Sequence, residues 1–230
     1  MLRKNIIAII PARGNSKRIP GKNYKNFNGK PIIVNTIKKL KKSKIFDRII
    51  VSTDSKKIAL ISKKSGAEIP FRRPKFLSDD YTSGTSVIAH SIRFLLKEGC
   101  QFDYVCCVYP PNPFLRISDL KKGLEKIRSK KINYVFSATS YRFPLFRSFT
   151  FSRKRGIKVL FKNNISKRSQ DLEEIICDAG QFYWGRKEAW LQEEKLFAKG
   201  SDIIVVPKWR YHDIDTLDDW KRAELFSKLI

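Results

Sequence analysis

The feature that most constrains this chain is an unbroken apolar run that leads directly into a loop rich in cations. Residues 6–10 are all apolar, without polar residues in alternation, which is typical of a strand buried on both faces of a parallel sheet. Ligands of open α/β sheets bind beyond the carboxyl ends of such strands. The sequence therefore predicts a binding loop at residues 11–23.

This loop has the composition of an anion site. It combines four cations with two glycines, which let backbone amides approach an anion: Arg13, Lys17, Arg18, Lys22, Gly14 and Gly21. The combination suits a nucleoside triphosphate. The alternative is a solvated basic loop after a core strand.

The spacing excludes two familiar phosphate motifs. Six residues separate Gly14 from Gly21, whereas a P-loop has four, and Asn23 follows Lys22 where a P-loop has Ser or Thr. A dinucleotide fingerprint needs three closely spaced glycines, and this loop has two. The chemistry is therefore of another kind.

The order of predicted elements indicates an α/β fold with a mostly parallel central sheet. Apolar runs predict further strands at 48–54, 103–109, 133–138, 180–184 and 203–206. Apolar residues at helical spacing predict helices starting at 31, 55, 86, 119, 187 and 216, the last opened by a capping box of Thr216 and Asp219.

The pattern changes at about 140–178, where the chain becomes aromatic, basic and irregular. Four phenylalanines precede a predicted hairpin that includes residues 157–161: Phe143, Phe146, Phe149 and Phe151. This segment looks like a small insert, and an oligomer contact is its expected role. The 230 residues then form a single domain, 1–230, with enough apolar content for a core.

Composition narrows the class of protein further. No run is long enough to cross a membrane and no signal peptide opens the chain, so we expect a soluble cytoplasmic protein without a membrane partner. The four cysteines show no C-x-x-C spacing, and adjacent Cys106 and Cys107 should point to opposite faces of a strand. Reduced, buried thiols are expected rather than a metal site.

The net charge of +26 raises the question of nucleic-acid binding. The lysines are spread over predicted helix faces, however, and no nucleic-acid-binding motif accompanies them. We therefore expect no nucleic-acid partner, and a field that attracts anionic substrates. A non-catalytic, basic nucleic-acid-binding protein on this scaffold remains the alternative from another class.

Two carboxylates near the end of the chain are candidate metal ligands. Asp213 and Asp215 lie on one face if their segment is extended, and Mg²⁺ takes one or two carboxylates together with water and phosphate oxygens. The alternative is that they cap the final helix. Other candidates are Arg73, in a position to grip a nucleotide, and the polar loop at 78–85, which leads into a helix N-terminus.

These residues carry a resemblance to a known family. Residues 10–23, Arg73-Pro74 and the Asp-Ile-Asp-Thr at 213–216 resemble the CMP-sugar cytidylyltransferases that activate sialic-acid-type sugars, over essentially the whole chain. Residues 168–172 and 178–185 are most similar to the pseudaminic acid branch. The resemblance implies a three-layer, nucleotide-diphospho-sugar transferase-like fold with a dimerisation insert at about 140–178.

The resemblance also implies a reaction and a set of site residues. CTP and a nonulosonic acid, most similar to pseudaminic acid, would give the CMP-sugar and pyrophosphate with Mg²⁺ as cofactor. The implied catalytic residues are Arg13, Lys22, Asp213 and Asp215, the two aspartates holding the metal. The implied nucleotide-binding residues are Arg13, Gly14, Asn15, Ser16, Lys17, Lys22, Asn23, Arg73 and Ser83.

The sugar would meet Tyr109, Arg168 and Gln170, the last two in the partner subunit's site of a homodimer whose insert reaches across. Tyr109 stands where the sialic acid enzymes have a Gln, and Cys177 aligns with an Arg that helps to bind sugar in those enzymes. The loss of a cation at position 177 argues against sialic acid itself as the substrate. Sialic, legionaminic or another 2-keto sugar acid remains the alternative substrate. The eight-carbon acid enzymes resemble the loop less, because they lack its Gly-Lys-Asn continuation.

Overall fold

The computed structural model describes residues 6–129, 131–141 and 145–229. The elements of the body are β1 (Ile6–Pro11), β2 (Asn26–Phe27), β3 (Lys30–Pro31), α1 (Ile32–Ser43), β4 (Arg48–Ser52), α2 (Lys56–Lys64), α3 (Gly84–Lys97), β5 (Tyr104–Val108), α4 (Ile117–Ser129), β6 (Tyr134–Ser140), β9 (Ile176–Arg186), α5 (Lys187–Leu191), β10 (Ser201–Val205) and α6 (Leu217–Ser227). The hairpin strands β7 (Phe149–Ser152) and β8 (Gly156–Val159) lie outside it.

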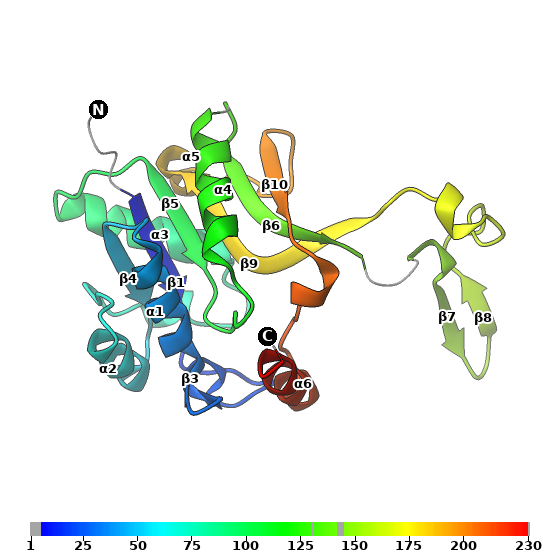
Figure 1. The fold of residues 1–230 in the computed structure, drawn as a ribbon, viewed down its shortest axis with the longest axis horizontal. Helices are drawn as coiled ribbons and strands as arrows, with labels where there is room; N and C mark the ends of the chain where they lie inside the picture. Colours follow the sequence, from blue (N-terminus) through cyan, green and yellow to red (C-terminus); the bar gives the residue numbers. More distant parts are fainter. Residues whose placement is uncertain (1–5, 130, 142–144, 230) are drawn as a thin grey trace.

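The central sheet has the strand order β10-β6-β9-β5-β1-β4 (Figure 1). β1 runs parallel to β4 and β5, and β10 runs parallel to β6, as predicted. β9 is antiparallel to both of its neighbours and is longer than the predicted strand at 180–184. It enters the sheet from the segment that carries β7 and β8, without the helical crossover that a parallel neighbour needs.

Helices cover both faces of the sheet, which makes the predicted three layers. Alternate residues of β1 divide between these layers: Ala8 packs with α1, α2 and α4, whereas Ile9 packs with α3 and α5. Cys106 and Cys107 divide in the same way, which confirms that they point to opposite faces. β1 is therefore enclosed by core on both sides, and its loop emerges at a defined edge.

A third, smaller cluster connects the end of the chain to the first loop. Trp220 of α6 packs edge-on against Phe27 with 5.6 Å between ring centroids, and Ile19 and Ile214 are buried beside them. The predicted capping box is confirmed: the Thr216 side chain accepts from the Asp219 amide, and Asp219 accepts from the Thr216 amide. This packing holds residues 211–216 against the loop at 16–23.

An arm projects from the body between β6 and β9 (Figure 1). The hairpin predicted there is present as β7 and β8, and its apolar side chains face solvent: Phe149, Phe151 and Ile157 are 56%, 69% and 64% exposed. Phe143 lies outside the described residues. Three exposed apolar side chains on a thin projection are unusual for a surface without a partner.

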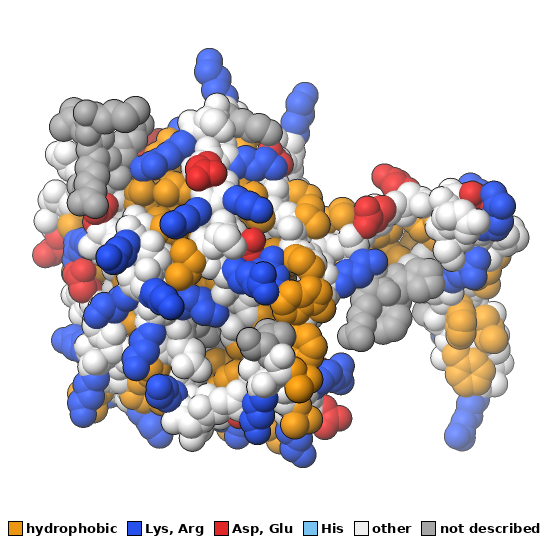
Figure 2. Space-filling view, in the orientation of Figure 1, with side chains coloured by type: hydrophobic (Ala, Val, Ile, Leu, Met, Phe, Trp, Pro, Cys, Tyr) orange, Lys and Arg blue, Asp and Glu red, His pale blue; other side chains and the backbone are white. Residues whose placement is uncertain are grey.

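The surface of the body is dominated by cations. Lys and Arg side chains are spread over the face seen in Figure 2 rather than gathered in one groove. Among the described helices, none combines the length and the apolar character that crossing a bilayer requires.

Candidate active site

A cleft of about 760 Å³ opens where β1 and β5 end. Its walls come from the loop after β1, from residues 73–87, from the segment 109–112 after β5, from residues 178–180 of β9, and from residues 211–215. Five segments that are distant in sequence therefore meet at one edge of the sheet. This is the edge at which an open α/β sheet binds its ligands.

The cleft brings together most of the residues that the sequence singled out. Its lining includes Arg13, Ser16, Lys17, Lys22, Asn23, Arg73, Tyr109, Asp213 and Asp215. Gly14, Asn15 and Ser83 belong to the bordering loops and are not part of the lining. Arg168 and Gln170 lie on the arm, at the short helical turn Ser169–Asp171, and do not reach this cleft.

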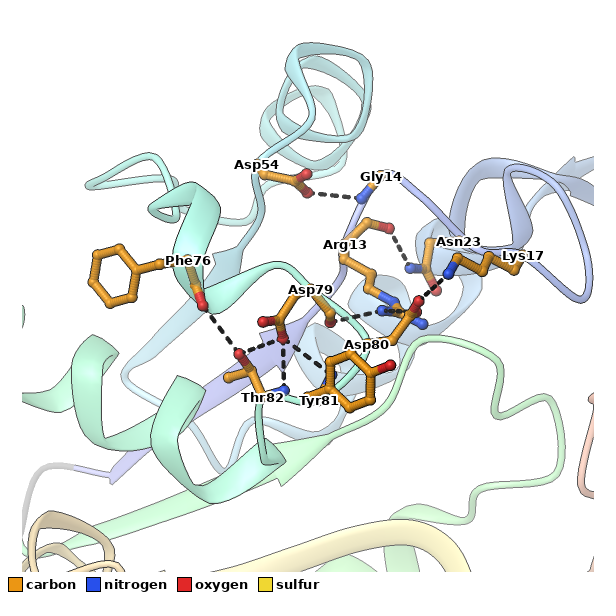
Figure 3. Close-up of polar contacts among 10 residues, drawn as sticks. All are labelled: Arg13, Gly14, Lys17, Asn23, Asp54, Phe76, Asp79, Asp80, Tyr81 and Thr82. Carbon is orange, nitrogen blue, oxygen red and sulfur yellow. Dashed lines mark hydrogen bonds and ion pairs between the residues drawn. The ribbon is translucent and has the colours of Figure 1, made fainter.

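The first loop is held by hydrogen bonds between its backbone and the side chains of Asp54 and Asn23. The Gly14 amide donates to Asp54 Oδ1 at 2.7 Å, and Asn23 Nδ2 donates to the Arg13 carbonyl at 2.9 Å (Figure 3). The Gly14 amide is thus already occupied and does not point at a ligand. Glycine is needed at this position because a Cβ would lie 2.9 Å from the Cβ of Ser55, which opens α2.

Two carboxylates pair with the four cations of the loop. Arg13 Nη1 lies 2.7 Å from Asp80 Oδ1, and Lys17 Nζ lies 2.5 Å from Asp80 Oδ2 (Figure 3). At the other end of the cleft, Asp215 accepts from Arg18 and lies 3.3 Å from Lys22 Nζ. The cations that would bind phosphate are thus held in place by exchangeable anions.

Arg73 is the buried cation of the site, with 5% of its surface exposed. Its Nε donates to Ser52 Oγ at 3.0 Å, which fixes the guanidinium at the end of β4. Burial lowers the pKa of Arg73 to about 10, so the side chain stays charged at neutral pH. A fixed charge of this kind can orient a ligand without reorganising.

Asp213 and Asp215 both line the cleft, whereas Ile214 between them is 2% exposed. The two carboxylates therefore share one face, as the spacing predicted. The side-chain capping box of α6 is formed by Thr216 and Asp219, and neither Asp213 nor Asp215 takes part in it. Desolvation, and then the charge of Asp215, raise the pKa of Asp213.

This donor set fits a magnesium ion. The described residues contain no cluster of three or more His, Cys, Asp or Glu side chains arranged for a metal. Magnesium does not need one, because it commonly takes one or two carboxylates and completes its shell with water and substrate phosphates. Two carboxylates that line the same cleft as the cationic loop provide such a partial shell.

The opposite side of the cleft is less charged and leads into a side pocket of about 190 Å³. Tyr109 and Asp178 line both spaces, and Leu196, Phe197 and Trp190 make the pocket largely apolar. Asp178 accepts hydrogen bonds from the Tyr183 hydroxyl and, at 2.9 Å, from the Gly180 amide. A ligand with polar and apolar substituents fits this half of the site.

Several residues of the site were not singled out from the sequence. Asp80 and Asp178 lie within segments that were noted for their polarity or their resemblance, but neither was given a role. Asp54 ends a predicted strand, and a polar residue at that position more often indicates the cap of the following helix. Ser83, which was predicted to bind nucleotide, caps α3 by accepting from the Ser86 amide at 3.0 Å. Tyr211 also lines the cleft, and no motif in the sequence around it indicated a role in binding.

Comparison with known proteins identifies the class to which this fold and site belong. A family model described as cytidylyltransferase matches residues 7–178, three quarters of the chain. The chain belongs to the cytidylyltransferase family, as the sequence predicted. It is an enzyme of the CTP-dependent nucleotidyltransferase type.

Individual relatives match along the whole length. The chain is 39% identical to a pseudaminic acid cytidylyltransferase of Campylobacter jejuni, over 97% of this chain and 96% of that protein. It is 38% identical to a CMP-N,N'-diacetyllegionaminic acid synthase of Legionella pneumophila, over 97% of each. The name of the first relative refers to pseudaminic acid and that of the second to N,N'-diacetyllegionaminic acid.

A solved structure of a CMP:2-keto-3-deoxy-manno-octonic acid synthetase in complex with CTP shares the fold. It matches with a TM-score of 0.72 over 98% of this chain and 100% of that one. At 15% identity this likeness shows the fold alone, and it confirms the predicted nucleotide-diphospho-sugar transferase-like architecture.

Gly14→Ala should weaken CTP binding by about tenfold, because small displacements of a binding loop are costly. The added Cβ would lie 2.9 Å from Ser55 Cβ and would push the loop from α2 without changing any charge. Calorimetric titration with CTP measures the effect. The double variant Gly14→Ala, Ser55→Gly should recover most of the affinity, and an unchanged dissociation constant in Gly14→Ala would contradict the packing argument.

Proposed function

We propose that this protein transfers CMP from CTP to the anomeric hydroxyl of a nonulosonic acid, with pseudaminic acid as the substrate. The observation that carries the proposal is a cleft that joins the cationic loop to the paired Asp213 and Asp215, in a chain 39% identical throughout to a pseudaminic acid cytidylyltransferase. Its lining charges suit a triphosphate at one end. We further propose that the enzyme works in the cytoplasm, where CTP is supplied.

The reaction requires alignment rather than a covalent enzyme intermediate. The anomeric oxygen attacks the α-phosphorus of CTP, the bond from that phosphorus to the β-phosphate bridging oxygen breaks, and pyrophosphate leaves. The hydroxyl proton passes to a base, for which the carboxylates of Asp213 and Asp215 are the candidates. Charge accumulates on the phosphoryl oxygens, so fixed cations lower the barrier.

The residues of the cleft divide between the two substrates. Arg13, Lys17 and Lys22 would hold the triphosphate, with Ser16 and Asn23 lining the same loop, and Arg73 would meet the cytidine. Gly14 and Asn15 would shape this loop. Ser83 would act through the N-terminus of α3, which it caps. Tyr109 would contact the sugar.

Asp213 and Asp215 would hold Mg²⁺. When bound, the ion would neutralise part of the phosphate charge. Asp215 would then exchange its present partners, Arg18 and Lys22, for the metal. Both cations would thereby become free to face the departing pyrophosphate.

We also infer a homodimer in which the arm contacts a second copy. Three exposed apolar side chains on the hairpin support it, and they need a covering surface. Arg168 and Gln170 lie at the turn Ser169–Asp171 of the same arm, and neither lines the cleft of its own chain. In the dimer they would face the partner's sugar. Arg168 now pairs with Asp171, with 2.8 Å from Nε to Oδ2, which is an exposed and readily exchanged contact.

The direct test is pyrophosphate release with CTP, Mg²⁺ and a panel of sugar acids. Release should require all three components and should be fastest with pseudaminic acid, followed at lower rates by legionaminic and sialic acids. Omission of Mg²⁺ or replacement of CTP by ATP provides the controls. No release with any nonulosonic acid would refute the function, and a preference for legionaminic acid would reassign the substrate.

Asp215→Asn should lower kcat by about 100-fold or more, because it removes a negative ligand from the site of charge development. Its Mg²⁺ half-saturation should also rise. Asp218→Asn is the matched control, since Asp218 is exposed in the first turn of α6 and lies outside the cleft lining. Turnover is measured at several Mg²⁺ concentrations. Unchanged kcat and metal dependence in Asp215→Asn would rule out the metal role.

Phe151 and Ile157 face each other across the hairpin, so changing both to Asp should convert the dimer to monomers. Sedimentation velocity measures the change. Sugar-dependent turnover should fall with it, whereas CTP binding should persist because its residues lie on the body. Thr150→Asp, at the intervening position of β7, is the matched control. A double variant that remains dimeric would exclude this interface.

A further inference from the structure

The Asp80 carboxylate forms ion pairs with two of the cations that would bind the phosphates of the nucleotide. Asp80 uses both of its oxygens: Oδ1 lies 2.7 Å from Arg13 Nη1, and Oδ2 lies 2.5 Å from Lys17 Nζ (Figure 3). The Asp79 carbonyl accepts a second hydrogen bond from Arg13 Nη1 at 2.8 Å. Two oxygens shared between an arginine and a lysine reproduce the contacts that a phosphate group would make.

The loop that presents Asp80 also has hydrogen bonds of its own that involve neither Arg13 nor Lys17. Asp79 Oδ1 accepts from the amides of Tyr81 and Thr82 at 3.0 and 2.7 Å, so the turn closes on itself (Figure 3). The Thr82 hydroxyl lies within hydrogen-bond distance of Asp79 Oδ1 and of the Phe76 carbonyl, at 2.7 and 3.1 Å. The turn can therefore keep its shape when Asp80 gives up its partners.

The contact is charged but exchangeable. Hydrogen bonds from Lys17 and Arg13 lower the pKa of Asp80, so the carboxylate is ionised at neutral pH. About a third of the Arg13 and Asp80 side chains and 75% of the Lys17 side chain are exposed. Exposed ion pairs contribute little net stability, and a triphosphate carries more negative charge than one carboxylate.

We propose that Asp80 is a positioning residue of the nucleotide site: it holds Arg13 and Lys17 in the ligand-free enzyme and yields them to the phosphates of the incoming nucleotide. The inference rests on the proposed function, in which these two cations bind CTP. Asp80 thereby keeps the cations ordered and at the same time competes with the ligand. Its removal should strengthen phosphate binding and leave recognition of the base unchanged.

Calorimetric titration of Asp80→Asn with CTP, CDP, CMP and cytidine tests the proposal. The dissociation constant for CTP should fall by about three- to tenfold, which lies within the range expected for release of two exposed ion pairs. The gain should shrink as phosphates are removed and should vanish for cytidine. In steady-state assays KM for CTP should fall while kcat does not rise.

Asp79→Asn is the matched control, because Asn retains the acceptor oxygen that closes the turn and Asp79 contacts Arg13 only through its carbonyl. Its affinities should equal those of the wild type. In a Lys17→Met protein, adding Asp80→Asn should raise the CTP affinity by less than Asp80→Asn does in the wild type, since one of the two competing contacts is already absent. Thermal unfolding followed by circular dichroism checks that each variant is folded.

Two failures are distinguishable. If the wild type binds and turns over CTP but Asp80→Asn binds it equally or more weakly, the competing role of Asp80 is wrong and the function stands. An equal gain in affinity for CTP and for cytidine would also overturn the competing role, because that role predicts a gain that depends on the number of phosphates in the ligand. If the wild type neither binds CTP nor releases pyrophosphate, the proposed function itself fails.

Discussion

The structure depends on the burial of β1 between two layers of helices. Its apolar side chains alternate between the two main clusters of the core, and each isoleucine contributes about 1.5–3 kcal/mol when fully buried. This double burial fixes where the strand ends and therefore where its loop begins. The cations of the loop are assembled in one place because the pairing of β1 with β4 and β5 fixes where the strand ends.

The positive charge of the first loop is partly neutralised by carboxylates of the same cleft. Asp80 and Asp215 each pair with two cations of the first loop, one at each end of the site. Unpaired cations at such density would repel one another and lose order. Under the proposed function, Asp80 would compete with the triphosphate for these cations and Asp215 would be a magnesium ligand.

Much of the fold followed from local patterns, because periodicity and capping act within a few residues. The strand at 6–10, the helix capped by Thr216 and the hairpin in the insert were all predicted and are present. The antiparallel direction of β9 was not predictable from its apolar run, since direction depends on how the chain returns from the arm. The ion pairs of Asp80 were not predictable either, because its partners are more than sixty residues away in the sequence.

By itself, the sequence determined the α/β class, the cationic loop, the paired aspartates and the family, since all of these are carried by short motifs and local periodicity. Only the tertiary structure decided which residues share the cleft. Packing of Trp220 and Ile214 against Ile19 and Phe27 brings Asp215 to Lys22, and the course of the arm takes Arg168 and Gln170 away from their own chain's site. Such contacts depend on packing between segments distant in sequence, which no local pattern encodes.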